Sequence, residues 1–311
     1  MAGRVVVVGS LNMDLRVLCE RVPERGETVI GSSLSFAPGG KGANQAVAAA
    51  RLGASVAMAG RVGSDDFGRA LRESLRASGV DVALVASGKA ATGTALVVVD
   101  ERGENRIVVV PGANGEVLLA DAEPLLRDAR GDLVLLQLEI PLATVRDVAD
   151  AARRAGARVL LNAAPAASAA RALAGLVDHL VVNESEAALL SGRAIGAPDA
   201  ERAAVEALVA AGFEEVTLTR GERGALHRAR DGWLEAAAPQ VDVVDTTGAG
   251  DAFVGGLAAA WSRGADRRAA LALAVAAGSL AVTREGAQPS LPRLAEAEAL
   301  AAAIAVRSPA R

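Results

Sequence analysis

The feature that most constrains this chain is a series of short runs rich in valine and leucine, which stand before stretches with helical periodicity. Apolar residues in these runs do not alternate with polar ones, a pattern typical of strands buried on both faces of a parallel sheet. We therefore predict an α/β fold with a mostly parallel central sheet. The five predicted strands are Val5–Val8, Leu133–Leu136, Val159–Leu161, Leu180–Val182 and Val216–Leu218.

Amphipathic stretches between these runs predict crossover helices, and several of them are closed by a glycine, as helix C-termini often are. A length of 311 residues suits one α/β domain with an ample core, so we expect a single domain over residues 1–311. The predicted helices are Ala43–Leu52, Phe67–Ala77, Leu142–Ala155, Asp199–Ala211, Ala252–Arg263 and Arg267–Val282.

Two segments break this rhythm and are predicted to be extended without a crossover helix. They are Leu15–Phe36, and Thr94–Val99 with Ile107–Val110 joined by the turn Asp100–Gly103. We expect them to form a small sheet, contributed by about 14–36 and 92–110, that covers a site on the main sheet as a lid. An edge hairpin without a function is the alternative.

Charge and cysteine content favour small partners and a cytoplasmic location. The formal net charge is −4, which gives no long-range attraction to nucleic acid or to an anionic membrane surface. A single cysteine, Cys19, excludes an internal disulfide, and two histidines are too few soft ligands for a structural zinc site. We read His179 and His227 as structural, and Met1–Gly9 as too short in apolar residues for an export signal.

Lysine is rare in this chain, which makes the placement of Lys41 between Gly40 and Gly42 informative, since Lys89 is the only other lysine. The glycines allow the backbone to approach a ligand closely, and a helix that begins here would direct its positive end at the same ligand. The segment is not a Walker phosphate loop, because Ser35 stands at the first glycine position. A tight turn with a solvated cation is the alternative.

Polar side chains after the first strand suit a polyol. Asn12 and Asp14 are two residues apart, so they point the same way if the chain is extended, and Asn44 could join them. Amide and carboxylate groups bind hydroxyls as donors and acceptors. Asparagine and aspartate are also common in ordinary turns, which is the alternative.

The strongest local signal is Asp245–Asp251, with the sequence Asp-Thr-Thr-Gly-Ala-Gly-Asp before a predicted helix. Gly248 and Gly250 allow consecutive amides to form a concavity for an anion, and Asp251 beside it could take a proton from an attacking hydroxyl. Such a base, an anion cradle and a metal nearly complete the requirements of phosphoryl transfer. The alternative is that Asp251 caps its helix.

Two further strand ends carry weaker signals. Asn183 and Glu186 lie three residues apart, a spacing that suits a hydrated Mg²⁺ but also a helix capping box. The turn Thr219–Gly224 could line a nucleotide or could be ordinary hairpin chemistry.

Taken together, these motifs resemble the ribokinase/PfkB family of carbohydrate and nucleoside kinases in order and spacing over nearly all of the chain. The motifs that carry the resemblance are Gly9-Ser-Leu-Asn-Met-Asp14, Gly39-Gly-Lys-Gly-Ala-Asn-Gln45, Leu138-Glu139, Asn162-Ala-Ala-Pro165, Asn183-Glu-Ser-Glu186, Asp245-Thr-Thr-Gly-Ala-Gly-Asp251 and Ala281-Val-Thr-Arg-Glu-Gly-Ala-Gln-Pro-Ser290.

The resemblance implies a three-layer α/β/α sandwich with a small β lid that clasps the lid of a second subunit, and hence a homodimer. It also implies ATP-dependent phosphorylation of ribose at its 5-hydroxyl, with Mg²⁺ and a monovalent cation, usually K⁺.

By position, the resemblance also assigns roles to individual residues. It implies sugar binding by Asn12, Asp14, Gly40, Lys41, Gly42, Asn44 and Glu139, with Asp251 as the base and the amides of Gly248, Ala249 and Gly250 as the anion hole. It implies that Asn183 and Glu186 organise Mg²⁺ and phosphates, while Thr219, Arg220, Gly221, Gly224, Gly250 and Val275 line the nucleotide. The implied cation residues are Asp245, Thr247, Ala281, Arg284, Gly286 and Ser290.

The chain departs from the family at Val275, where asparagine or histidine is common near the adenine, so the base-contacting wall differs. Other readings remain open: a relative acting on fructose, a sugar acid or a nucleoside, or a non-catalytic sensing module. Aromatic residues make up 2% of the chain and tyrosine is absent, which disfavours a nucleoside pocket. The absence of a strict Gly-x-Gly-x-x-Gly motif disfavours a dinucleotide-dependent oxidoreductase.

Overall fold

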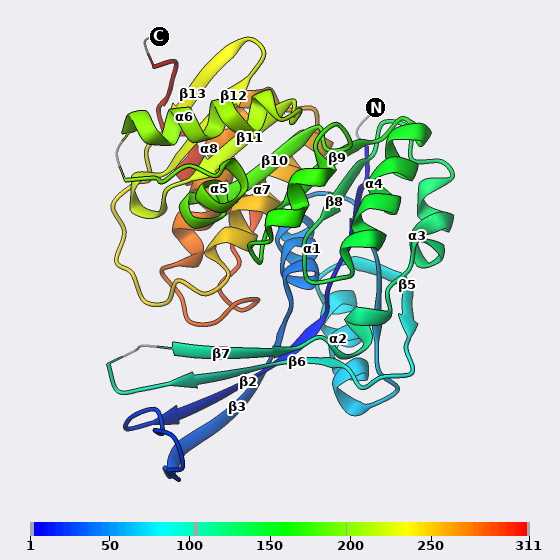
Figure 1. The fold of residues 1–311 in the computed structure, drawn as a ribbon, viewed down its shortest axis with the longest axis vertical. Coiled ribbons are helices and arrows are strands. Elements are labelled where there is room, and N and C mark those ends of the chain that lie inside the picture. The colour runs from blue at the N-terminus through cyan, green and yellow to red at the C-terminus, as the bar shows by residue number, and fades with distance from the viewer. Residues whose placement is uncertain (1–2, 103–104, 197, 310–311) are drawn as a thin grey trace.

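A ten-stranded, mostly parallel sheet forms the centre of the protein in the computed structural model, which describes residues 3–102, 105–196 and 198–309 (Figure 1). The strand order is β14-β13-β12-β11-β10-β9-β8-β1-β4-β5, and only the pairs that join β11 to β14 are antiparallel. The strands are β1 (Val5–Val8), β4 (Val56–Val62), β5 (Val80–Ser87), β8 (Leu133–Leu136), β9 (Arg158–Asn162), β10 (His179–Asn183), β11 (Glu215–Thr219), β12 (Ala225–Ala229), β13 (Gly232–Ala236) and β14 (Val306–Arg307).

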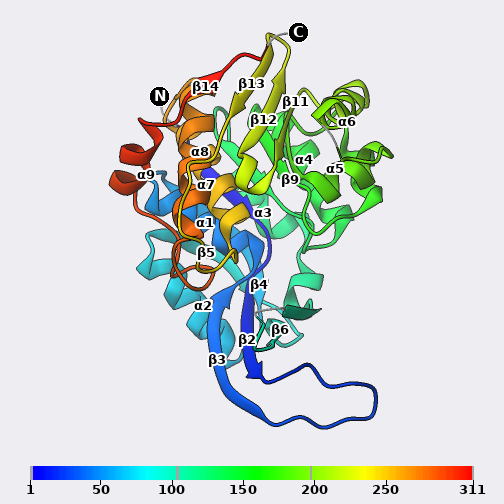
Figure 2. The ribbon, with the colours of Figure 1, turned by 90° about the vertical axis from the view of Figure 1, so that its left-hand side faces the viewer.

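Helices cover both faces of this sheet, as the α/β/α prediction requires (Figure 2). One face carries α1 (Lys41–Arg51), α2 (Asp66–Ala77), α7 (Ala249–Ser262), α8 (Arg267–Ala281) and α9 (Leu294–Ala301). The other carries α3 (Leu119–Leu126), α4 (Leu142–Ala155), α5 (Glu184–Ser191) and α6 (Pro198–Ala210). Short 3₁₀ turns lie at η1 (Gly112–Glu116), η2 (Ser168–Leu173) and η3 (Gly221–Arg223).

The unalternated strands fill two separate cores. Val5 and Val7 of β1 pack toward α1 and α7, whereas Val6 and Val8 pack toward the side of α4, and all four side chains are fully buried. Successive side chains in a strand point to opposite faces, so a strand between two helix layers must be apolar at every position. The five predicted strands and the fold class are confirmed for this reason.

A second, four-stranded sheet projects from the main body (Figure 1). Its order is β3-β2-β6-β7, with β2 parallel to β6 and antiparallel pairs outside them. The strands are β2 (Asn12–Cys19), β3 (Gly31–Gly39), β6 (Gly93–Val99) and β7 (Asn105–Val110). The segments predicted to be extended therefore form one sheet; Gly103 of the predicted turn lies outside the described residues.

The predicted helix Arg267–Val282 corresponds to α8, which ends one residue earlier. No helix of the described ranges is long and apolar enough to cross a membrane. His179 and His227 are buried side chains whose rings share the hydroxyl of Thr217, at 2.6 and 2.9 Å. Burial lowers the pKa of both histidines and keeps them neutral, in keeping with a structural role.

Candidate active site

Polar residues gather where the parallel strands end. Asn12 and Asp14 follow β1, Glu139 follows β8, and the helices α1 and α7 begin at the same edge of the sheet with Lys41 and Asp251 in their first turns. Ligands of open α/β sheets bind outside the carboxyl ends of the strands. The fold therefore brings together residues that are up to 239 positions apart in the sequence.

Asp251 is a buried carboxylate held between two helices. Its Oδ2 accepts a hydrogen bond from Asn44 Nδ2 at 2.9 Å, and its Oδ1 accepts one from Gln45 Nε2 at 2.9 Å. The N-cap of α7 is Gly248, so the alternative that Asp251 caps its helix is excluded. Burial raises the pKa of Asp251 above its ordinary value, and the charge of Glu139 adds to the rise; Lys41 and the two amide hydrogen bonds favour the ionised form and oppose the shift.

Lys41 sits among carboxylates at the start of α1. Burial by itself would lower the pKa of Lys41, but the charges of Asp251, Glu139, Glu186 and Asp14 outweigh it and raise the pKa. The ammonium is therefore charged and, although only partly buried, lies among carboxylates, so the alternative of a solvated cation on a turn does not apply.

The loop before α1 requires glycine. Gly40 has φ 89°, and a Cβ at this position would lie 2.6 Å from the Asn12 nitrogen. Glu139 ties the loop to the sheet, because its Oε2 accepts from the backbone N–H of Lys41 at 3.0 Å and from Ser10 Oγ at 2.6 Å. The Gly42 amide donates to the same Ser10 hydroxyl at 3.2 Å.

Asn12 and Asp14 lie on one face of β2, as their spacing predicts. Asn12 is buried and accepts a hydrogen bond from Asn114 Nδ2 at 2.7 Å. Burial, together with the nearby charges of Glu139 and Asp251, raises the pKa of Asp14 to about 7, against the opposing effect of Lys41. The site thus holds more carboxylates than its single ammonium can neutralise.

The glycine-rich turn before α7 offers free amides. The helix begins at Ala249, three residues before the predicted Ala252, so Gly250 belongs to the first turn and not to a loop. Within the described part of the chain, the N–H groups of Gly248, Gly250 and Asp251 have no hydrogen-bond acceptor, whereas that of Ala249 donates to the Thr246 carbonyl at 3.3 Å. Such free amides at a helix start favour an anion.

A cavity of about 1130 Å³ opens beside this turn. Thr219, Gly221, Gly224, Gly250 and Val275 line it, as expected for a nucleotide. Glu222 and Arg223 of the same predicted turn also line it, as do Thr246 and Ala249 of the glycine-rich motif. The sequence did not indicate the rest of its wall, which is formed by Ala238, Pro239, Gln240, Val241, Asp242, Val243, Phe253, Gly278, Ser279 and Val282. Since Gly250 belongs to both, the cavity and the free amides are continuous.

Arg220 differs from the expectation that it contacts the nucleotide. It does not line the cavity, and its guanidinium lies 2.8 Å from Glu235 and 3.5 Å from Glu201. Both of those carboxylates come from outside the turn, so the sequence around Arg220 gave no sign of these ion pairs.

Asn183 and Glu186 form the capping box that was the alternative to a metal site. Asn183 Oδ1 accepts from the Glu186 N–H at 2.8 Å, and Glu186 Oε2 accepts from the Asn183 N–H at 2.8 Å. Burial raises the pKa of Glu186, although Asn183 and Lys41 oppose the shift. Among the described residues, no group of three or more His, Cys, Asp or Glu side chains is placed to hold a metal ion.

The residues expected at a monovalent cation lie on two adjoining segments. Asp245 accepts from the N–H and hydroxyl of Thr247 at 2.9 and 2.7 Å, and from the Gly286 N–H at 2.9 Å. Burial raises the pKa of Asp245, but these hydrogen bonds outweigh it and lower the pKa. Ser290 is buried, whereas Arg284 bonds Glu296. Ala281 ends α8.

Several residues of the site were not singled out from the sequence. Ser10 and Asn114 support the polar face of β2 and the loop before α1, and Gln45, Gln137 and Asn162 form a buried amide network behind Asp251. For Gln45, its place directly after Asn44 was the available signal, because both residues lie near the start of the same helix, α1.

Comparisons with known proteins agree with this geometry. Residues 2–294 match the family described as pfkB family carbohydrate kinase. A ribokinase from Bacillus subtilis (strain 168) is 40% identical over 300 residues, covering 95% of this chain and 98% of that protein. A deoxyribokinase from Salmonella typhi is 36% identical over 293 residues, covering 93% and 96%.

Solved structures show the same similarity. The structure of Arabidopsis thaliana ribokinase complexed with ribose and ATP has a TM-score of 0.89 and 34% identity, covering 97% of this chain and 99% of that one. Phosphofructokinase-2 from Escherichia coli in complex with potassium has a TM-score of 0.82 and 25% identity, covering 97% and 99%.

Proposed function

The chain belongs to the pfkB family of carbohydrate kinases, and from that premise we propose that it transfers the γ-phosphoryl group of ATP to the 5-hydroxyl of ribose. The observation that carries the proposal is the buried Asp251 carboxylate, which lies in the first turn of α7 beside free amides and a large cavity. The similarity to ribokinases over nearly the whole chain supports ribose as the sugar.

In the proposed reaction, Asp251 accepts the proton of the 5-hydroxyl as its oxygen attacks the γ-phosphorus. The new bond joins this oxygen to phosphorus, the bond between the γ-phosphorus and the β–γ bridging oxygen breaks, and ADP leaves. The free amides at the start of α7 stabilise the negative charge on the transferred group, which is the main task of a protein in phosphoryl transfer.

The proposed sugar site lies between the polar face of β2 and α1. Asn12, Asp14, Asn44 and Glu139 offer donors and acceptors to the hydroxyls, and Lys41 lies among four carboxylates. Asn44 Oδ1 is a buried acceptor with no partner among the described residues, so it is available to a sugar hydroxyl. The backbone at Gly40 and Gly42 allows the ring to approach closely.

The proposed nucleotide site is the cavity lined by Thr219, Gly221, Gly224 and Val275. Mg²⁺ bound with ATP would neutralise charge on the phosphates. A protein cage for the ion is not required, since Mg²⁺ keeps several waters and binds mainly through substrate phosphates. Asn183 and Glu186 fit this role from a distance, Glu186 through a water and Asn183 by holding Glu186 in place.

We also propose a K⁺ site formed by Asp245, Thr247, Ala281, Arg284, Gly286 and Ser290, in which Arg284 would contribute only its carbonyl because its side chain bonds Glu296. The ionised Asp245 bridges the segment before α7 and the Gly286 loop, so an ion there would order the free amides. The test compares the ribose-dependent rate in KCl with the rate in choline chloride at equal ionic strength. A faster rate in KCl is expected, and equal rates would contradict the proposed K⁺ site.

The small sheet of β2, β3, β6 and β7 is proposed to be a lid, contributed by about 14–36 and 92–110, that excludes water from the bound sugar, and to pair with its counterpart in a homodimer. Excluding water matters because an open site would hydrolyse ATP. We propose a cytoplasmic location because the proposed reaction consumes ATP and the lone cysteine cannot form an internal disulfide.

The first prediction tests the base. Asp251→Asn keeps the shape of the side chain but cannot accept the proton, so ribose-dependent ADP formation is expected to fall by about 10²- to 10⁴-fold. The matched control is Asp128→Asn, an exposed aspartate outside the site, which is expected to keep the wild-type rate. Equal rates for Asp251→Asn and wild type would reject the proposed chemistry.

The second candidate function is phosphorylation of a different sugar, which the similarity to a deoxyribokinase favours. Initial rates with ribose, 2-deoxyribose, fructose, a sugar acid and a nucleoside at equal concentrations separate these candidates. Ribose is expected to give the highest kcat/KM. A higher kcat/KM for another acceptor would make that acceptor, and not ribose, the proposed substrate.

A further inference from the structure

Three amide side chains form a buried network behind Asp251. Gln45 Nε2 donates to Asp251 Oδ1 at 2.9 Å and to Asn162 Oδ1 at 2.9 Å, and Gln45 Oε1 accepts from Gln137 Nε2 at 2.7 Å. Gln45 and Gln137 are fully buried, and Asn162 is 9% exposed. The network joins α1 to α7 and to the ends of β8 and β9.

The direction of every hydrogen bond in this network is fixed by Asp251. An ionised carboxylate only accepts, so Gln45 must present its NH₂ group to Asp251. Its carbonyl oxygen then faces Gln137, which must in turn present its own NH₂ group. Rotating either amide by 180° would place two acceptors or two donors against each other, so Gln45 is held in one orientation.

We propose that Gln45 is the positioning residue that orients Asp251 and favours its ionised form, with Gln137 and Asn162 fixing the Gln45 amide. This inference rests on the proposed function, in which Asp251 is the base. Asn44 also bonds Asp251, but it is proposed to bind the sugar as well. Gln45 is fully buried within the network, so its effect on the reaction passes through Asp251.

Removing the Gln45 amide has a directional consequence. The hydrogen bond from Gln45 favours the charged carboxylate and so lowers the pKa of Asp251, as do the charge of Lys41 and the hydrogen bond from Asn44. Burial and the charge of Glu139 act in the opposite direction. Without this bond the carboxyl group keeps its proton to a higher pH, and the base is lost over a wider acidic range. A hydrogen bond to a charged group is strong enough to shift a titration by about one pH unit.

The test is the pH dependence of kcat at saturating ribose and ATP for Gln45→Met, which keeps the length of the side chain but removes its amide. The acid limb of the profile is expected to move upward by about one pH unit, with a roughly tenfold lower kcat on that limb and a recovery toward wild type at higher pH. Ribose binding at high pH, measured by calorimetry, is expected to stay within a few fold of wild type.

The matched comparison is Gln137→Met, which removes an equally buried amide of the same network but leaves the bond between Gln45 and Asp251. It is expected to shift the acid limb by less than half as much. If Gln45→Met does not fold, as judged by thermal melting, Gln45→Glu keeps the shape and is expected to shift the limb in the same upward direction.

An unmoved acid limb in a folded Gln45 variant, or equal shifts in the Gln45 and Gln137 variants, would overturn the proposal. Failure of the proposed function is distinguishable, because then Asp251→Asn would retain activity. If Asp251→Asn loses activity but the acid limb of the pH profile does not move in Gln45→Met, the proposed function stands and only the proposed role of Gln45 is rejected.

Discussion

At the scale of single residues, the site is defined by an imbalance of charge. Lys41 is one partly buried cation facing Asp14, Glu139, Glu186 and Asp251. Close carboxylates in a buried site cannot all be ionised without cost, so one of them holds a proton near neutral pH. The pKa of Asp14 is raised to about 7, so this carboxyl group titrates near neutral pH, and the pKa of Asp251 is raised as well.

This raised pKa predicts a pH dependence of sugar capture. As pH falls through about 7, Asp14 gains a proton and can no longer accept two hydroxyl hydrogen bonds with a full charge, so kcat/KM for ribose is expected to fall. Asp14→Asn, which is always neutral, is expected to lose this step and to have a roughly tenfold lower kcat/KM at pH 8. Asp128→Asn should keep the wild-type pH profile of kcat/KM. If the step near pH 7 persists in Asp14→Asn, the step belongs to another titrating group.

The sequence identified the charged residues of the site more completely than the amides that orient them. Lys41 and Asp251 stand out because they adjoin glycines at helix starts. Gln45 and Gln137 carry no such local signature, because a buried glutamine becomes informative only when its partners on other elements are known. The expectation that Arg220 lines the nucleotide cavity differs from the structure for the same reason, since the ion-pair partners of Arg220 lie outside its turn.

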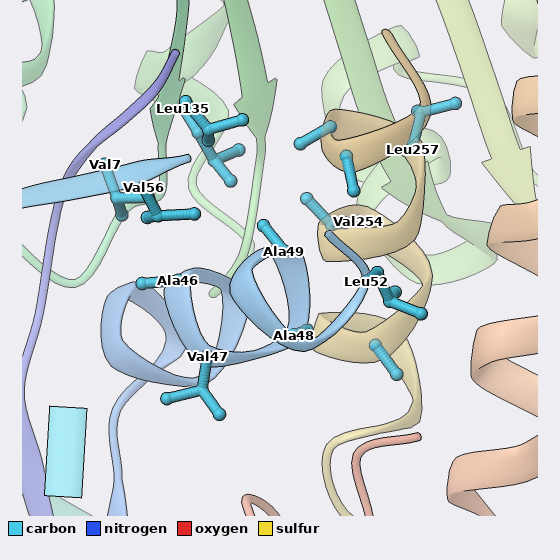
Figure 3. Close-up of a cluster of buried hydrophobic side chains, with 14 of the residues drawn as sticks. Val7, Ala46, Val47, Ala48, Ala49, Leu52, Val56, Leu135, Val254 and Leu257 are labelled. Carbon is cyan, nitrogen blue, oxygen red and sulfur yellow. The ribbon is translucent and has the colours of Figure 1, made fainter. Parts of the chain in front are cut away.

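At the scale of elements, the contact between α1 and α7 determines where Asp251 lies relative to Asn44 and Gln45. Figure 3 shows this contact, with Ala48 and Ala49 of α1 beside the ribbon of α7. The two backbones approach closely at Gly255, one turn after Asp251. A Cβ at Gly255 would lie 2.9 Å from the backbone nitrogen of Ala49 and 3.0 Å from the backbone oxygen of Gln45, so α7 carries glycine there.

Gly255→Ala is therefore expected to push α7 away from α1 and to displace Asp251 from its hydrogen bonds. We expect kcat to fall at least tenfold, because small displacements of a catalytic group are costly, and the free energy of unfolding to fall by about 1–3 kcal/mol. The control is Gly115→Ala, where the nearest atom to a new Cβ is 3.9 Å away. Full kcat in a destabilised Gly255→Ala enzyme would show that this contact does not position the base.

The elements that sequence patterns missed have a common physical cause. β4 contains alanine and glycine in Val-Ala-Met-Ala-Gly-Arg-Val, residues that are depleted in strands, although its burial makes it a central strand. The start of α7 was placed three residues late because glycine is a poor helix former. In both cases packing against neighbouring elements overrides the local preference of the chain.

At the scale of the whole molecule, the small sheet is the part whose composition does not suit a monomer. Residues paired in register share a face, so the face opposite Asn12 and Asp14 carries five exposed large apolar side chains. They are Leu34, Phe36, Leu96, Val108 and Val110. The sequence predicted extended segments here, but the parallel pairing of β2 with β6, which gathers these side chains, depends on residues about 80 positions apart.

An apolar face of this kind is typical of interaction surfaces, and in the proposed dimer its position on the proposed lid would connect subunit pairing to closure of the site. Val108→Lys, on the edge strand β7 and 61% exposed, is expected to give a monomer with intact folding in sedimentation or light scattering. The matched variant is Val109→Lys on the same strand but the opposite face, which is expected to remain dimeric. Because a lid without its partner closes less firmly, the Val108→Lys monomer should also show a higher KM for ribose and more ribose-independent ATP hydrolysis. A wild-type protein that is monomeric at all concentrations would contradict the proposed dimer. Equal oligomeric states of the two variants would place the pairing surface elsewhere. In either case the apolar face would serve the lid alone.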